Sequence, residues 1–132
     1  MENTKGKLQT KLTQLEIHAK RTGQVLDSGS VEAIERHTGA LRSTISEADE
    51  LKRALEALKI EAEEDLGDIS TWNAAIDLQL MKADEEVGKL RKWLEDRRRQ
   101  EETTAREGQL KFEMKLHEQK MKFRPTDRKS VV

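Results

Sequence analysis

The sequence contains no cysteine, no tyrosine and only one proline. These shortages limit the covalent links, metal sites, helix breaks and aromatic cores that the chain can form. Without cysteine the chain can form no disulfide, no thiolate metal site and no cysteine nucleophile. Nothing before the single proline, Pro125, removes a backbone donor from a helix. Aromatic residues are also scarce, with two Trp and two Phe among 132 residues. A wide, bulky core is therefore not expected.

Charged residues make up 39% of the chain, against 34% for hydrophobic residues. Helix-to-helix packing suits this composition, because each helix buries one stripe and leaves the rest of its surface in water. No apolar run approaches the ~20 residues of a membrane span, and the N-terminal sequence MENTKGKLQTK lacks the apolar core of a signal peptide. We expect an intracellular, soluble protein with no membrane partner, cytoplasmic in preference to nuclear.

The motifs that mark common enzyme and cofactor sites are missing from the sequence. It contains no GxxxxGK[ST], no GxGxxG and no GxSxG. The acidic stretch EAEEDLGD does not follow the ligand pattern of a calcium-binding EF-hand loop. Glu113 and His117, one helical turn apart, are too few ligands for zinc. We predict no enzyme activity, no cofactor, no metal site and no small-molecule substrate.

Apolar residues recur at spacings of three and four along most of the chain, which is the pattern of helices with one buried face. The pattern is interrupted at DSGS, where Ser and Asp can cap helix ends and Gly29 can take a positive φ. At a second interruption, LGDIS, Gly67 can close one helix and Asp68 or Ser70 can cap the next. These breaks predict helices near residues 5 to 26, 31 to 66 and 70 to 123.

The predicted fold is all-α: a long antiparallel coiled-coil helical hairpin of the second and third helices, with a shorter N-terminal helix packed along it. A hairpin folded about Asp68 would place Lys89, Arg91 and Lys92 opposite Glu47, Asp49 and Glu50. The predicted domains are an N-terminal helix with its Ser/Gly break, the hairpin, and a basic helical extension with a disordered tail, at residues 1–30, 31–106 and 107–132.

This fold predicts a non-enzymatic module for self-association or scaffolding, with a second copy or another helical protein as partner. The contacts would be made by the apolar stripe of the hairpin. The residues of this predicted seam are Leu41, Ile45, Leu55, Leu58, Ile76, Val87, Leu90 and Leu94.

An alternative function is suggested by the arginine cluster Arg97, Arg98 and Arg99, together with Arg106. These side chains are candidate contacts for a nucleic acid, because Arg binds phosphate groups. Acidic residues one helical turn away compete for the same arginines, which favours a salt-bridged helix face over phosphate binding. Binding of a nucleic acid by an accessory protein stays open as the alternative.

The last residues suggest a further contact. Ser130 and Val132 resemble the C-terminal ligand of a PDZ domain. Such a ligand adds a strand to a sheet edge and inserts its last side chain into a pocket. A PDZ-type partner is therefore a second candidate interaction.

Two stretches of the third predicted helix resemble the coiled-coil region near the N-terminus of proteins encoded by Pao/BEL-type retroelements. They are ADEEVGKLRKWLEDRRRQEE and REGQLKFEMKLHEQKMKF. The resemblance extends back through VEAIERHTGALRSTISEADELKRALEALKIEAEEDL and covers residues 26–123. In that family the helical region precedes a Gag-like segment, a protease and a polymerase region, none of which is expected here. The resemblance implies a stand-alone or truncated Gag-like fragment that self-associates, and it carries over no catalytic residue.

Overall fold

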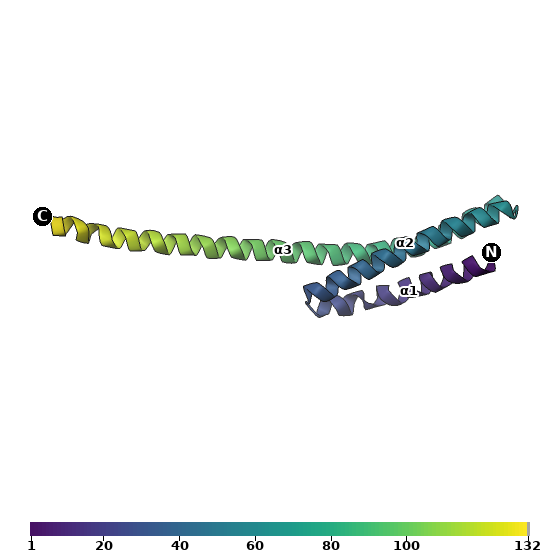
Figure 1. Ribbon diagram of the computed structural model, residues 1–132, viewed down its shortest axis with the longest axis horizontal. Coiled ribbons are helices and arrows are strands. Elements are labelled where there is room, and N and C mark those ends of the chain that lie inside the picture. Colours follow the sequence, from purple (N-terminus) through teal and green to yellow (C-terminus); the bar gives the residue numbers. More distant parts are fainter. Residues whose placement is uncertain (132) are drawn as a thin grey trace. The chain divides into compact units, whose positions relative to one another are not determined.

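The computed structural model describes the backbone of residues 1–131 and the side chains of residues 1–120. It contains three helices, α1 Glu2–Asp27, α2 Val31–Glu61 and α3 Leu66–Val131 (Figure 1). No strand occurs among residues 1–131. The prediction of an all-α fold with three helices is therefore confirmed.

The chain divides into two units, Met1–Leu94 and Glu95–Val132. The first unit holds α1, α2 and the part of α3 up to Leu94, and these helices run side by side in alternating directions (Figure 1). The second unit contains the remainder of α3. The three domains proposed from the sequence, with their boundaries after residues 30 and 106, stay predictions.

The turn between α1 and α2 follows from local side-chain chemistry. Gly29 adopts φ 64°, which is the left-handed conformation that glycine reaches without a steric penalty. Ser30 is the N-cap of α2, and its hydroxyl accepts a hydrogen bond of 3.3 Å from the Ala33 N–H. Both roles were predicted from the sequence, and the structure confirms them.

The turn between α2 and α3 differs from the prediction. Glu63, not a glycine, takes the left-handed conformation, with φ 56°. The Glu63 N–H donates to the Ile60 carbonyl and the Glu64 N–H donates to the Lys59 carbonyl, which together form a Schellman motif at the end of α2. The prediction that Gly67 closes this helix was wrong, because the motif places its left-handed residue four positions earlier.

Asp65 caps α3, in place of the predicted Asp68 or Ser70. The Asp65 carboxylate accepts a hydrogen bond of 3.1 Å from the Asp68 N–H, so α3 begins at Leu66 and not near residue 70. A Cβ on Gly67 would lie 2.9 Å from the capping Asp65 oxygen. Gly67 therefore leaves room for the cap of the helix that follows it.

The core of the first unit is one cluster of aliphatic side chains from all three helices. Most of the predicted seam is buried here, within a single chain. Ile45 and Leu94 are partly buried against the cluster, and Leu58 is half-buried. The other five are almost fully covered: Leu41, Leu55, Ile76, Val87 and Leu90.

The register of α2 against α3 is also shifted from the prediction. Lys52 pairs with Asp77, and the Lys59 ammonium lies 5.0 Å from the centre of the Trp72 ring. Both contacts fit a turn at residues 62–65 rather than at Asp68. The predicted pairing of Lys89, Arg91 and Lys92 with acidic residues of α2 was wrong: Glu47 pairs with Lys11, Asp49 with Arg53, and Lys89 with Glu86.

The far end of α3 also departs from the prediction. The helix was expected to end near residue 123, ahead of Pro125, and it continues to Val131. A proline removes one backbone hydrogen bond and can kink a helix without ending it. The presence of Pro125 was therefore an insufficient reason to place a helix end.

Candidate functional site

The described part of the chain holds neither a cluster of metal ligands nor a helix that could span a membrane. Among those residues no three His, Asp or Glu side chains gather in a way that could hold a metal ion. No helix in the same part of the chain has both the length and the apolar composition needed to cross a bilayer. The candidate site is therefore sought among exposed surfaces and grooves.

The predicted arginine cluster lies on an exposed helix surface, and two of its four arginines are paired with neighbouring acids. The Arg97 Nε lies 3.3 Å from a Glu101 carboxylate oxygen, and the Arg98 Nε lies 3.9 Å from Glu102. Arg99 and Arg106 form no ion pair with any residue whose side chain is described. These i to i+4 pairs fit the favoured interpretation of a salt-bridged helix face.

The same part of α3 carries balanced charge. Residues 95–120, here called the C-terminal segment, contain seven acidic and seven basic side chains. Every residue of this segment is exposed. A segment with balanced charge has no net attraction for a polyanion, since binding of nucleic acid depends on an excess of cations.

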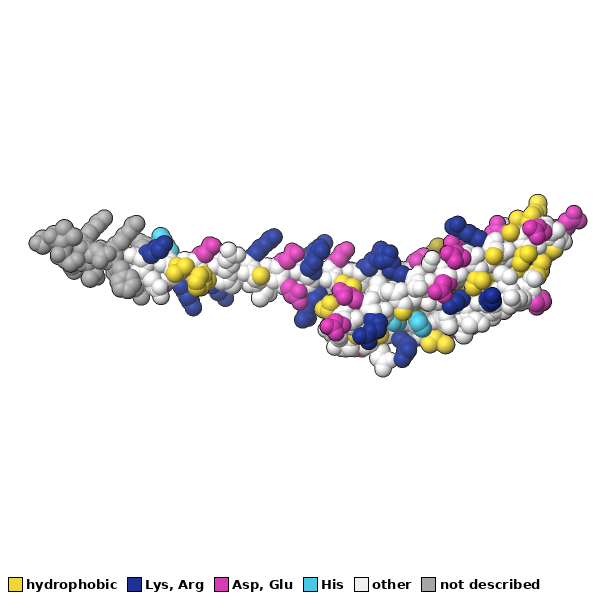
Figure 2. All heavy atoms as spheres, in the orientation of Figure 1, with side chains coloured by type: hydrophobic (Ala, Val, Ile, Leu, Met, Phe, Trp, Pro, Cys, Tyr) yellow, Lys and Arg dark blue, Asp and Glu magenta, His cyan; other side chains and the backbone are white. Residues whose placement is uncertain are grey.

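The C-terminal segment also exposes four large apolar side chains, and hydrophobic groups appear at its surface in Figure 2. Their exposed fractions are 58% for Leu110, 63% for Phe112, 58% for Met114 and 42% for Leu116. At about 100° per residue, Leu110 and Met114 share one side of the helix while Phe112 and Leu116 share nearly the opposite side. The segment therefore has two apolar faces.

The sequence pattern gave only a partial signal of these two faces. Apolar residues reappear after a polar stretch, but at a spacing of two, which is neither the regular helix stripe nor a long run. A hairpin folded about Asp68 already leaves residues 107–123 without a partner in the chain, so the sequence predicts that this overhang docks on another copy or continues as a helix in solution. None of the four side chains was among the predicted site residues, and the structure gives the exposure of each.

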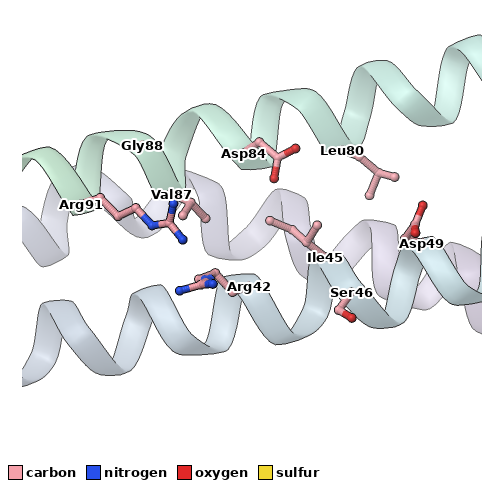
Figure 3. Close-up of a pocket in the computed structure, with 9 residues that line it drawn as sticks. All are labelled: Arg42, Ile45, Ser46, Asp49, Leu80, Asp84, Val87, Gly88 and Arg91. Atoms are coloured by element: carbon pink, nitrogen blue, oxygen red, sulfur yellow. The ribbon is translucent and has the colours of Figure 1, made fainter.

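A shallow groove between α2 and α3 is a second candidate (Figure 3). Its apolar lining comes from Ile45, Leu80 and Val87. Arg42 and Arg91 reach into it from opposite helices, as Figure 3 shows, and neither forms an ion pair within the described residues. Asp49 and Asp84 line the same groove, so its charge is balanced and it does not favour an anion. It also contains no nucleophile paired with a base.

The predicted PDZ ligand cannot be placed. Val132 lies outside the described residues, and the Ser130 side chain lies outside those described. A PDZ-type partner therefore stays a prediction.

No family model, no curated protein and no solved structure matches this chain. The resemblance to Pao/BEL-type retroelement proteins accordingly stays a prediction.

Proposed function

We propose that the protein is a non-enzymatic self-association module in which the C-terminal segment packs against the same segment of other copies. The observation that carries this proposal is the exposure of four large apolar side chains on one stretch of helix, from Leu110 to Leu116. Exposed apolar groups that gather on a short stretch are typical of surfaces that bind another protein.

Apart from burial of these apolar side chains against a partner, few interactions stabilise the C-terminal segment as a helix. Its contacts include ion pairs from Arg97 to Glu101 and from Arg98 to Glu102, and each such pair adds roughly 0.2–0.5 kcal/mol. Gly108 opposes them, because glycine in a helix interior costs about 1 kcal/mol relative to alanine. Most helical stability in proteins comes from packing an apolar face. A partner helix would supply that packing.

A second copy is the partner that the charges favour. The seven acidic and seven basic side chains of the segment let it face itself without net repulsion. An acidic or basic partner would gain nothing from such a surface. Because the two apolar faces are nearly opposite, one helix can contact two neighbours, which supports assemblies larger than a dimer.

The predicted seam contributes to this function indirectly. Leu41, Leu55 and Leu90 are at most 1% exposed within one chain, so they stabilise the first unit. A contact between copies through these residues would require the first unit to open. The proposed association therefore uses residues 110–116 rather than the seam.

Sedimentation velocity over a range of concentrations tests the proposal. The Phe112→Gln/Leu116→Gln variant and the Leu110→Gln/Met114→Gln variant each remove one apolar face and keep a good helix-forming residue. We expect the native chain to form a species larger than a dimer and each variant to form smaller species.

The matched control is Leu78→Gln/Met81→Gln in the first unit, where the two side chains are 53% and 56% exposed. This control removes comparable apolar surface and should sediment like the native chain. A native chain that stays monomeric at every concentration, or a control that dissociates as much as the variants do, would contradict the proposal.

The proposed function extends to the evolutionary origin of the protein and to its location in the cell. Self-association is the activity expected of a Gag-like fragment, so the resemblance of residues 26–123 to retroelement proteins is consistent with it. We place the protein in the cytoplasm, on the grounds of its charged, cysteine-free composition. Localisation of a fluorescently tagged full chain would check the compartment.

Binding to nucleic acid is the alternative function, with Arg99 and Arg106 as the arginines without an ion pair among the described residues. Titration of RNA and DNA at several salt concentrations tests it. Phosphate contacts would give an affinity that falls steeply as salt rises and that weakens in Arg99→Gln. Absence of binding at low salt would exclude this alternative.

A further inference from the structure

Two histidines face each other where α1 packs on α2 in the first unit. The ring centroids of His18 and His37 are 6.1 Å apart, and the rings are tilted by 32°. The Nε2 of His37 lies 3.3 Å from the hydroxyl oxygen of Thr22, a side chain that is 1% exposed. The Nδ1 of His18 is buried without a hydrogen-bond partner. The two rings thus have fixed surroundings and one unused polar atom.

These histidines line a surface groove that contains no acidic residue. Arg21 and Gln24 of α1 and Arg36 of α2 line the same groove, together with small and aliphatic residues. The chain as a whole has 26 acidic residues among 132, so a nine-residue lining with two Arg, two His and no carboxylate is unlike the rest of the molecule.

The two arginines are available to a ligand. Neither Arg21 nor Arg36 forms an ion pair with a described residue, and Glu32, one turn before Arg36, does not pair with it. The i to i+4 spacing of Glu32 and Arg36 on α2 would allow such a pair. Its absence leaves both guanidinium groups at the groove without a counter-charge from α1 or α2.

Burial and the positive charges at the groove lower the pKa of His37. Burial lowers the pKa of His37 below 6.5, and the neighbouring His18 and Arg21 lower it further. The opposing influences are a backbone hydrogen bond at His18 and the carboxylate of Glu86 on α3. Glu86 is itself held by Lys89, at 3.0 Å. An anion in the groove would therefore relieve an unfavourable charge arrangement.

We infer that this groove binds a tetrahedral dianion of the phosphate or sulfate class between Arg21 and Arg36, beside His18 and His37. The planar guanidinium group presents paired donors that match such an oxyanion. The Gln24 amide offers another donor on the same lining. The site is separate from the C-terminal segment, so this function is additional to self-association.

The bound dianion should favour the charged form of His37. Binding is then linked to proton uptake and tightens as the pH falls toward the lowered pKa of His37. His18 and Arg21 repel the His37 proton in the free protein, and Glu86 attracts it. Sulfate is the cleanest probe, since it stays a dianion over this range, whereas a phosphate ester takes up a proton near pH ~6.

Nuclear magnetic resonance of the imidazole groups in the full chain tests the inference. Sodium sulfate is titrated at pH 7.5 and at pH 5.5, with sodium chloride at equal ionic strength as the reference. We expect saturable shifts of the His18 and His37 signals, no shift of His117, and an affinity several-fold higher at the lower pH. Equal, non-saturating shifts of all three histidines would overturn the inference.

Variants show whether the groove itself binds. Arg21→Gln and Arg36→Gln should each weaken sulfate binding about tenfold or more, in line with the loss of a charge-assisted contact. Arg42→Gln is the matched control, because Arg42 is another unpaired arginine of α2 that lines a different groove. Equal weakening in all three variants would show nonspecific screening and would contradict the site.

Titrating inorganic phosphate and glycerol 3-phosphate in the same way distinguishes a free phosphate from a phosphate ester as the ligand. Saturable binding of either one supports the site, and the tighter of the two identifies a free phosphate or a phosphate ester as the natural ligand class. If sulfate, inorganic phosphate and glycerol 3-phosphate all leave His18 and His37 unshifted at millimolar concentration, the inference is wrong.

Discussion

Lys52 of α2 lies against Asp77 of α3, with the ammonium nitrogen 2.5 Å from a carboxylate oxygen. The point midway between these residues in the sequence falls in the turn at residues 62–65, so the pair marks the register of the antiparallel helices. The Lys52 side chain is only 13% exposed and that of Asp77 is 57% exposed. Partial burial protects this contact from part of the screening that weakens surface ion pairs.

A double-mutant cycle with Lys52→Met and Asp77→Asn should reveal coupling between these side chains. We expect an interaction free energy of about 0.5–1 kcal/mol in urea unfolding, because the pair joins two helices and is partly covered. The control cycle uses Lys20 and Glu16, which are 75% and 68% exposed on one helix. Coupling at Lys52 and Asp77 no larger than in the control would show that the pair does not fix the register.

Leu90→Ala tests the core of the first unit. Leu90 is 0% exposed and belongs to the cluster shared by the three helices. Truncation should lower the free energy of unfolding by about 2–5 kcal/mol, since it removes buried methyl groups and leaves a cavity. The same truncation at Leu78, which is 53% exposed on the same helix, should change it by no more than about 0.5 kcal/mol. Similar losses at both positions would contradict the described packing.

Glu63→Gly should stabilise the protein. Glu63 holds φ 56°, a conformation that costs a residue with a Cβ roughly 1–2 kcal/mol and costs glycine little. The gain in urea unfolding should be up to about 1 kcal/mol, because glycine also loses more entropy on folding. Glu56→Gly, in the interior of α2, is the control and should destabilise by a similar amount. A loss of stability at position 63 would argue against the left-handed turn.

The number of helices and the first turn could be predicted from the sequence because their causes are local. Spacings of three and four report a buried helix face, and Gly29 with Ser30 is the chemistry that a helix end followed by a helix start requires. The second turn could not be predicted in the same way, because a glutamate does not signal a positive φ. Once the turn was misplaced at Asp68, every cross-helix pairing derived from it was shifted as well.

The candidate binding surfaces also differ in how far local sequence determines them. The pairing of Arg97 and Arg98 with acids four residues later could be read from sequence spacing. The hairpin prediction also leaves the stretch around Phe112 without a partner in the chain, and the structure shows that Phe112 is exposed. The acid-free groove around His18 depends on which residues of α1 and α2 lie side by side, so it could not be predicted from the sequence.

The pKa shift at His37 predicts how stability depends on pH. Because the folded state holds the pKa of His37 below 6.5, the unfolded chain takes up the proton first as the pH falls. The contribution of His37 is therefore fully present above pH 6.5 and is lost progressively as the pH falls from there through the lower folded pKa. In sulfate-free buffer, the urea midpoint of the native chain should decline over this window.

Replacing the imidazole separates this effect from other titrations. In His37→Gln the decline below pH 6.5 should become shallower, and in His117→Gln, which changes an exposed histidine of the second unit, it should be unchanged. The pKa of Glu47 is lowered from 4.5 by its hydrogen bond and charge contact with Lys11, so the contribution of Glu47 begins to be lost only below pH 4.5, whereas that of His37 begins to be lost at pH 6.5. Identical slopes in the native chain and His37→Gln would mean that His37 titrates alike in the folded and unfolded chains.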